Sequence, residues 1–236
     1  MSDKKKKIAA VLFDMDGVLI DSNSVIERAW REAAQMYGRT LSDADIVNHI
    51  HGQPGPHTIQ SLFSDLPLSD REKVQQYIIN AENTADYQPI PGVKTLIAAL
   101  ANAGITLGIV TSGWRYKIDR VIALLDAHDA VSVIVERDDV KRGKPWPDPY
   151  LLAVERLNIS ASRALVFEDS TSGVTSATRA GTFCVGIGGE NLLSHGAKLA
   201  IADFCGVRLL TTESGFTLAL SASHHLQLEH FDTLKP

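Results

Sequence analysis

VLFDMDGVLID, residues 11–21, is an apolar run that leads into two aspartates one residue apart. Side chains alternate between the two faces of a strand, so Asp14 and Asp16 point the same way, roughly 7 Å apart, and Met15 points away. At an effective dielectric constant near 20, two like charges at this distance repel by roughly 2 to 3 kcal/mol. The stretch therefore indicates a buried strand whose carboxyl end holds a compensating cation.

Other short apolar segments typical of buried strands recur along the chain, and helical patterns lie between most of them. These segments are Ile8–Phe13, Thr106–Val110, Val131–Val135, Ala164–Phe167, Phe183–Ile187 and, more weakly, Leu199–Ala202. Their alternation with helices predicts an α/β fold, a Rossmann-like parallel sheet with helices on both faces. Two of the helical segments end at Gly104 and Gly181, which suit the left-handed cap of a helix.

The segment 22–88 interrupts this alternation, because it contains several helical patterns and no convincing strand. Apolar residues recur at helical spacing at Ile26, Ala29, Trp30, Ala33 and Tyr37. Ser69 and Glu72 have the spacing of a capping box ahead of a further helical pattern. We therefore predict a helical cap domain, residues 22–88, inserted into an α/β core domain that comprises residues 1–21 and 89–236.

The composition limits the possible classes of function. With 236 residues and a net charge of −5, the chain can form a large core but lacks the positive charge that a nucleic-acid partner would need. No stretch approaches the ~18 apolar residues of a membrane span, and Lys4–Lys7 are interpreted as a solvated lead-in. Cys184 and Cys205 show neither disulfide nor metal-site spacing, which favours a cytoplasmic location. The sequence carries no indication of the oligomeric state.

Polar residues directly follow three of the predicted strands. Asp14 follows the first strand, Thr111 and Ser112 follow the second, and Glu168 and Asp169 follow Phe167. The carboxyl ends of the strands form the ligand crevice in an open parallel sheet. We therefore expect these groups to lie together although they are far apart in the sequence.

A lysine on a stiff loop adds a positive charge to this set. VKRGKPWPDPY, residues 140–150, places Lys144 between Gly143 and Pro145, in a proline-rich loop that cannot be helical. Such a lysine can deliver a point charge to a phosphoryl oxygen. VTSGWR, residues 110–115, adds a hydroxyl and backbone N–H groups where a helix begins, which also favours an anion.

Taken in order, four motifs resemble those of the haloacid dehalogenase superfamily. They are DMDGVL (14–19), VTSG (110–113), GKPWPDPY (143–150) and FEDS (167–170). The resemblance covers the chain from about residue 8 to 190 and includes a helical insertion between the first two motifs. HIHGQPG (49–55) and VKRGKPWPDPYLL (140–152) further resemble the sugar and polyol phosphatase branch, close to beta-phosphoglucomutase.

The resemblance implies a magnesium-dependent phosphatase that acts on a small sugar or polyol monophosphate. Asp14 would be the nucleophile that becomes an aspartyl-phosphate, and Asp16 the general acid and then the general base. Asp14, Asp169 and the backbone carbonyl of Asp16 would hold Mg²⁺, with Glu168 as an outer or water-mediated partner of the metal. The transferring phosphoryl oxygens would be held by Thr111, Ser112, Gly113 and Lys144.

The cap loop NHIHGQPGPH, residues 48–57, would determine substrate specificity, because such loops shape the pocket and exclude water. His51, Gln53 and His57 would bind substrate hydroxyls and Gly52 would also contact the substrate, although exposed polar residues are also ordinary on a Gly/Pro loop. Related sugar phosphatases often carry a basic residue where Gln53 stands. Trp114 would stack on a sugar face or serve only in packing.

Two alternatives remain open. A mutase of the beta-phosphoglucomutase type would use the same aspartyl-phosphate but return it to the bound sugar; the cap loop lacks a Lys or Arg to anchor the second phosphate end. A phosphosugar-binding regulator without catalysis is the other alternative. It is disfavoured because Asp14, Asp16, Lys144 and Asp169 are all present and binding alone needs no nucleophile.

Overall fold

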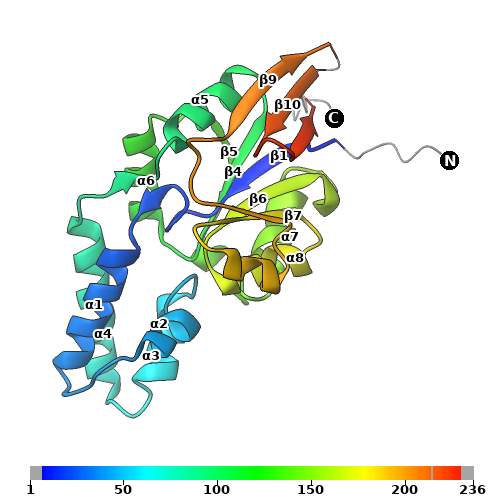
Figure 1. The fold of residues 1–236 in the computed structure, drawn as a ribbon. Helices are drawn as coiled ribbons and strands as arrows, with labels where there is room; N and C mark the ends of the chain where they lie inside the picture. Colours follow the sequence, from blue (N-terminus) through cyan, green and yellow to red (C-terminus); the bar gives the residue numbers. More distant parts are fainter. Residues whose placement is uncertain (1–6, 214, 230–236) are drawn as a thin grey trace.

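The computed structural model describes residues 7–213 and 215–229, and its centre is a parallel sheet of six strands in the order β5-β4-β1-β6-β7-β8 (Figure 1). The strands are β1 (Ala10–Phe13), β4 (Thr106–Val110), β5 (Val131–Val135), β6 (Ala164–Glu168), β7 (Phe183–Ile187) and β8 (Leu199–Ile201). The predicted α/β fold is confirmed. In β1, Phe13 pairs with Ile109 of β4 and with Phe167 of β6, so the carboxyl ends of these three strands lie level.

Helices cover both faces of the sheet because β1 is apolar on both. Val11 and Phe13 belong to the cluster packed by α5 (Val93–Asn102) and α6 (Arg115–Leu125), whereas Ala10 and Leu12 belong to the cluster packed by the helices on the other face. Those helices are α7 (Asp148–Arg156) and α8 (Thr171–Arg179). Short 3₁₀ helices complete the core at η1 (Arg137–Asp139), η2 (Ala161–Arg163) and η3 (Glu190–His195).

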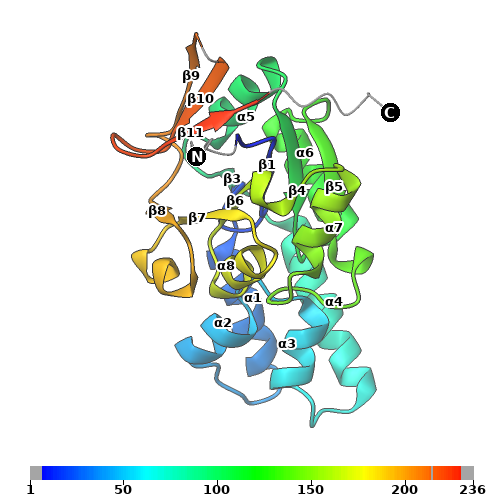
Figure 2. The same cartoon turned by 90° about the vertical axis from the view of Figure 1, so that its right-hand side faces the viewer.

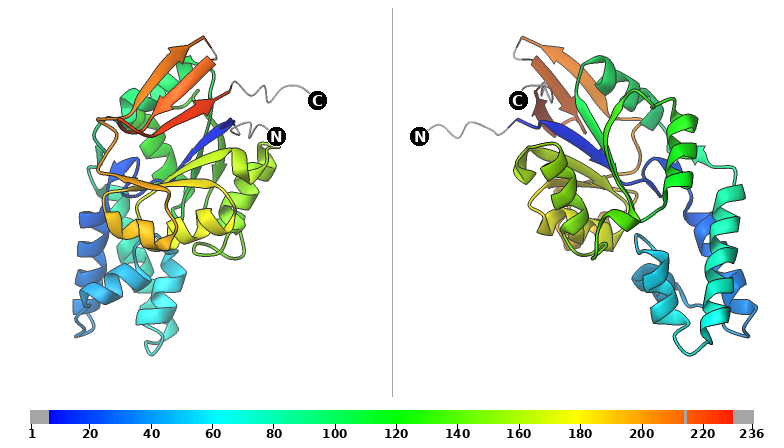
Figure 3. Two further views of the ribbon diagram at one scale, coloured as in Figure 1. Left: turned by 45° about the vertical axis from the view of Figure 1, so that its right-hand side comes forward. Right: turned by 180° about the vertical axis from the view of Figure 1, so that it is seen from behind.

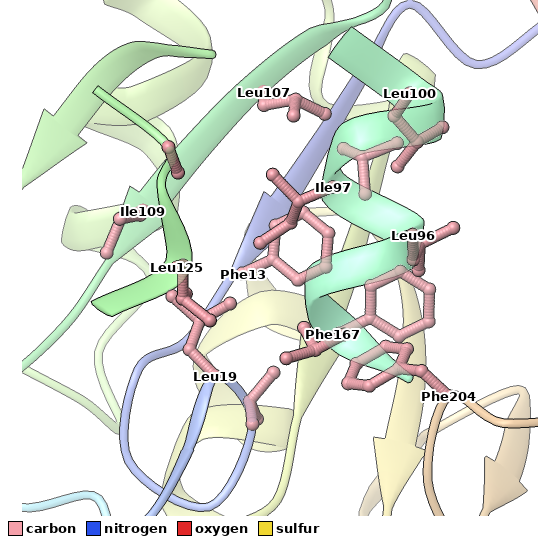
Figure 4. Packing of buried hydrophobic residues seen from close by; sticks show 14 of the residues in the cluster. Phe13, Leu19, Leu96, Ile97, Leu100, Leu107, Ile109, Leu125, Phe167 and Phe204 are labelled. Atoms are coloured by element: carbon pink, nitrogen blue, oxygen red, sulfur yellow. The ribbon is translucent and has the colours of Figure 1, made fainter. Parts of the chain in front are cut away.

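Aromatic rings mark the centre of the first cluster (Figure 4). The rings of Phe13 and Phe167 stack with centroids 5.4 Å apart, and Phe204 meets Phe167 edge-on at 5.0 Å. Ile97 and Leu107 lie beside Phe13 in the same cluster. This packing fixes β1 and β6 side by side, and therefore fixes the residues that follow them.

The segment between β1 and α5 forms a separate group of helices, seen at the lower end of the molecule in Figure 2. Its helices are α1 (Asn23–Gln35), α2 (Asp43–His49), α3 (Gly55–Leu62) and α4 (Leu68–Thr84). Their buried side chains form a cluster of their own, in which the Trp30 and Phe63 rings lie 6.0 Å apart. The chain enters and leaves through the antiparallel pair β2 (Ile20–Asp21) and β3 (Gln88–Pro89). On these grounds we propose that residues 22–88 form a cap domain.

Local details differ from the sequence predictions. The capping box at Ser69 and Glu72 was wrong, because α4 already begins at Leu68 after Pro67, with no side-chain cap. A capping box occurs instead at Ser42, whose hydroxyl accepts from the backbone N–H of Asp45 at the start of α2. Proline at the N-cap supplies the restricted backbone angle that starts α4 without a hydroxyl.

A second, antiparallel sheet in the order β11-β10-β9 was not predicted. Its strands are β9 (Arg208–Thr212), β10 (Gly215–Ala219) and β11 (His225–Leu228). Leu218 and Leu228 join the main cluster, while most of β9 is exposed. Figure 3 shows this sheet at the end of the molecule opposite the helical group. Short strands with a mixed exposed face give only a weak periodic signal, which is why the sequence did not reveal them.

No helix among residues 7–213 and 215–229 combines the length and the apolarity needed to cross a membrane. Of the interpreted lead-in Lys4–Lys7, only Lys7 lies within the described residues, where it is exposed.

Candidate active site

The loops after β1, β4 and β6 meet the cap loop around one cavity. The backbone N–H of Asp14 donates to the Phe167 carbonyl (3.0 Å), and that of Thr111 to the Val135 carbonyl (2.9 Å), which extends the sheet to the cavity edge. Among the residues singled out in the sequence, those that line the cavity are Asp14, Asp16, His51, Gly52, Gln53, Thr111, Ser112, Gly113, Trp114 and Asp169. Lys144 and Glu168 do not line this cavity; they are buried against Asp14.

Lys144 is held by two carboxylates and a carbonyl. Its Nζ donates to Asp14 Oδ1 and to Glu168 Oε1, both at 2.5 Å, and to the Val110 carbonyl at 3.1 Å. Burial by itself would lower the pKa of Lys144, but the carboxylates of Asp14 and Glu168 outweigh it and the pKa is raised. Tyr150 also donates to Glu168 Oε1, at 2.7 Å. A charged ammonium is therefore fixed directly against the proposed nucleophile.

Two glycines allow the acidic groups to approach. Gly17 has φ +70°, and a Cβ there would lie 1.9 Å from Asp169 Oδ2. Gly173, in the first turn of α8, would place a Cβ 2.0 Å from the Glu168 carboxylate. Gly17 is thus required both by the left-handed backbone angle of the turn and by the close approach of Asp169 after β6.

The carboxylates form a cluster suited to a hard cation. One oxygen each from Asp14, Glu168 and Asp169 lie within 4.8 Å of one another. Burial, and then the neighbouring carboxylates, raise the pKa of Asp14 well above its usual range despite Lys144. Burial and the charge of Glu168 raise the pKa of Asp169 to about 7, although Asn23 donates to its Oδ2 at 2.8 Å. These buried carboxylates have too little positive charge nearby to balance them. They offer only oxygen atoms as ligands, which are the ligands that Mg²⁺ prefers.

Asp16 has partners that the sequence analysis missed. Its Oδ1 accepts hydrogen bonds from Ser22 Oγ and Lys117 Nζ, both at 2.5 Å, and Lys117 also donates to Glu82 Oε2 at 2.5 Å. The helical periodicity of the sequence could have identified Lys117 and Glu82 as buried charges. Lys117 shares the buried face of α6 with Val121, and Glu82 follows Ile78 by one turn on the buried face of α4. Each charge thus occupies a position where the pattern calls for an apolar residue.

The cap loop lies against the core. Ser112 Oγ donates to the Gly52 carbonyl at 3.1 Å. Gly52 has φ +68°, and a Cβ there would lie 2.2 Å from Ser170 Oγ. His51 instead pairs with Glu27 of α1, Nε2 to Oε1 at 3.0 Å. The buried Oε1 of Gln53 accepts no hydrogen bond from the described residues.

The phosphoryl-binding prediction involves the start of α6. Thr111 Oγ1 accepts from the backbone N–H of Gly113 at 3.0 Å, which shapes the turn before the helix. Trp114 is the N-cap residue of α6, and its indole N–H donates to Asn83 Oδ1 at 3.0 Å. Trp114 therefore contacts the cap and lines the cavity at once. Its stacking on a sugar face stays a prediction.

Comparison with known proteins places this geometry in a family. The sequence profile of the haloacid dehalogenase-like hydrolases matches residues 11–187. A phosphorylated carbohydrates phosphatase from Thermotoga maritima is 34% identical over 176 residues, which cover 73% of this chain and 81% of the relative. Hexitol phosphatase A from Escherichia coli is 33% identical over 178 residues, or 75% and 81% of the two chains.

The fold comparison agrees. A putative beta-phosphoglucomutase from Bacteroides vulgatus superimposes with a TM-score of 0.74 at 26% identity, covering 85% of this chain and 86% of that chain. The resemblance inferred from the four motifs is therefore confirmed. From the extent of the profile match and the identity to these relatives, the chain belongs to the haloacid dehalogenase-like hydrolases.

Proposed function

We propose that the protein is a magnesium-dependent phosphatase that hydrolyses a small sugar or polyol monophosphate through an aspartyl-phosphate. The observation that supports this most is the position of Asp14, which lines the cavity while Lys144 fixes its carboxylate from behind. Relatives named as carbohydrate and hexitol phosphatases support the substrate class.

In the first step, a carboxylate oxygen of Asp14 forms a bond to phosphorus, and the bond from phosphorus to the sugar oxygen breaks. Asp16 gives its proton to the departing sugar oxygen. Asp16 lines the same cavity, and its side chain is 23% exposed, so a proton can pass from it to a ligand. The products of this step are the free alcohol and phosphorylated Asp14.

In the second step, Asp16 takes a proton from water, and the water oxygen attacks phosphorus. The bond between phosphorus and Asp14 breaks, which releases inorganic phosphate and restores both aspartates. Thr111 and Ser112, with the backbone N–H groups at the start of α6, would hold the phosphoryl oxygens in both steps.

Mg²⁺ would be held by the carboxylates of Asp14 and Asp169 and by the backbone carbonyl of Asp16, with Glu168 turned towards Lys144 and Tyr150. When bound, the cation stabilises the negative charge of the transferring phosphoryl group. The hydrolysis of phosphate monoesters is among the slowest reactions known without a catalyst. Acid–base catalysis raises its rate only about 10²- to 10⁴-fold, so the enzyme needs the cation as well.

The cavity favours hydrolysis over phosphoryl return. Its lining among the described residues contains no lysine or arginine, whereas it does contain Gln53 and Glu82. Neutral and acidic groups suit the hydroxyls of a sugar or polyol and would not bind a second phosphate.

The prediction of a cytoplasmic location rests on the usage of the cysteines, both of which are free.

A panel of sugar and polyol monophosphates, assayed for released phosphate with MgCl₂ and again with EDTA, tests the proposal. We expect phosphate release that depends on the metal. Isomerised sugar phosphate without phosphate release would instead indicate the mutase. Tight binding without turnover would indicate the regulator.

A further inference from the structure

Asp16, Lys117 and Glu82 form a buried ion cluster, hereafter the Lys117 cluster. The Lys117 side chain is 1% exposed, and its ammonium lies 2.5 Å from both carboxylates. The three residues come from three elements: the loop after β1, helix α6 of the core and helix α4 of the cap. The cluster therefore joins the proposed acid–base residue to the cap through one side chain.

A lysine at this depth needs its partners. Taking an ammonium out of water is unfavourable, and only good ionic geometry offsets the lost hydration. Burial alone would lower the pKa of Lys117, yet Asp16 and Glu82 outweigh it and the pKa is raised. The rings of Tyr87 and Trp114 lie 5.3 and 5.7 Å from Nζ and complete the enclosure. The side chain is therefore charged and held in one position.

The same face of α6 binds the end of the cap helix. Trp114 donates to the Asn83 side chain, and Arg120 donates to the backbone carbonyls of Asn83 and of Ala85. Arg120 thus satisfies carbonyls at the carboxyl end of α4, which have no partner within the helix. The position of α4 against α6 is fixed on both sides of Lys117.

Both hydrogen bonds to the Asp16 carboxylate are made to Oδ1, from Ser22 and from Lys117. Oδ2 is then the oxygen that exchanges a proton with substrate. Without Lys117, Ser22 alone would leave the carboxylate free to rotate about its terminal bond, since a single hydrogen bond fixes only one direction.

We propose that Lys117 is a positioning residue, which holds Asp16 in place for proton transfer only while Glu82 of the cap is docked beside it. The inference rests on the proposed function and assigns to a core lysine the link between cap position and the acid–base steps. Substrate that draws the cap onto the core would thereby complete the acid–base site.

The choice of leaving group provides the test. A sugar alkoxide needs a proton as it departs, whereas p-nitrophenolate departs without one. Lys117→Met removes the charge and keeps the length of the side chain. By rapid quench, we expect Lys117→Met to slow phosphorylation by a sugar phosphate about 100-fold or more. The burst of p-nitrophenolate from p-nitrophenyl phosphate should keep nearly its wild-type rate, with a slow steady state afterwards because water attack also needs Asp16.

Lys73→Met is the matched control, because Lys73 also lies on the cap but is 71% exposed and pairs with Asp70 on its own helix. We expect this variant to show wild-type rates with both substrates. Equal slowing of both substrates by Lys117→Met would overturn the inference.

A double variant separates positioning from stability, since Lys117→Met alone leaves the buried Glu82 carboxylate without its ion-pair partner and should lower the melting temperature. Lys117→Met/Glu82→Leu removes the cap carboxylate as well and should recover much of the melting temperature. The rate with sugar phosphate should remain low in it. Recovery of that rate together with stability would mean that Lys117 serves only to join the helices.

Failure of the inference differs from failure of the proposed function. A wild-type protein that releases no phosphate from any monophosphate would overturn the proposed function and the inference with it. A wild-type protein that turns over, together with a Lys117→Met variant whose two substrates behave alike, would overturn the inference alone.

Discussion

At the scale of single residues, the site depends on charges placed where water cannot reach them. Asp14 and Glu168 share the ammonium of Lys144, and Asp16 shares that of Lys117 with Glu82. Each lysine therefore contacts two carboxylates. The repulsion inferred from the sequence between Asp14 and Asp16 is thus met partly by lysines of the chain itself, and Mg²⁺ would meet the remainder.

Asp14→Asn should abolish turnover, because a neutral amide is too weak a nucleophile to form the acyl phosphate that the carboxylate forms. We expect phosphate release to fall to background in a variant with a wild-type circular dichroism spectrum. A folded Asp14→Asn protein with the wild-type rate would show that the nucleophile has been assigned wrongly.

Gly17→Ala should damage the site more than the fold. The left-handed angle costs an alanine roughly 1–2 kcal/mol, and the added Cβ would also displace Asp169, 1.9 Å away. We expect kcat/KM to fall on the order of 10²-fold and half-maximal activity to need more Mg²⁺. Gly38→Ala is the control, because Gly38 has nearly the same angle, φ +67°, and no atom within 4 Å of its Cβ. Gly38→Ala should lower the stability and leave kcat/KM unchanged.

At the scale of elements, periodicity predicted which faces are buried but not which charges they carry. The helical spacing that identifies the apolar faces of α4 and α6 also includes Glu82 and Lys117, which composition alone would place at the surface. The antiparallel sheet formed by β9, β10 and β11 shows the converse. Its strands are only partly buried, and the parallel alternation that organises the rest of the core does not extend to them.

Leu218→Ala tests whether this second sheet serves the fold alone. Leu218 of β10 is fully buried in the main cluster, so truncation should lower the free energy of unfolding by about 2–5 kcal/mol. Because the sheet lies at the opposite end of the molecule from the cap, kcat and KM of the folded fraction should not change (Figure 3). Leu210→Ala, at a 44% exposed position of β9, should change neither urea unfolding nor kinetics. A large change of kcat in Leu218→Ala would contradict this separation.

At the scale of the whole molecule, the proposed cap and the core meet at the level carboxyl ends of the strands. The Gly52 carbonyl accepts from Ser112, and Glu82 accepts from Lys117, so two segments of the proposed cap contact the core beside the cavity. The cavity thus exists only in the assembled molecule, because its lining comes from both parts of the chain.

Mg²⁺ should stabilise the folded protein, and more so at higher pH. The pKa of Asp169 is raised to about 7 without metal, so its ionisation destabilises the metal-free protein as the pH rises from about 4 through 7. Below about pH 7 the carboxyl of the folded, metal-free protein is protonated and binds the cation poorly. We expect MgCl₂ to raise the melting temperature more at pH 8 than at pH 5.5. Asp169→Asn should reduce this increase, and an equal increase in that variant would contradict the metal assignment.

The sequence by itself determined the parallel sheet, the helical insertion and the family, because these follow from local periodicity and from short motifs. It also identified the residues after the strands, since parallel strands end at one edge whatever the loops between them do. Only the tertiary structure decided that Lys144 contacts Glu168 as well as Asp14, and that Lys117 binds Asp16 across 101 residues of sequence separation. The partner of a buried charge depends on which elements pack together, and no local pattern carries that information.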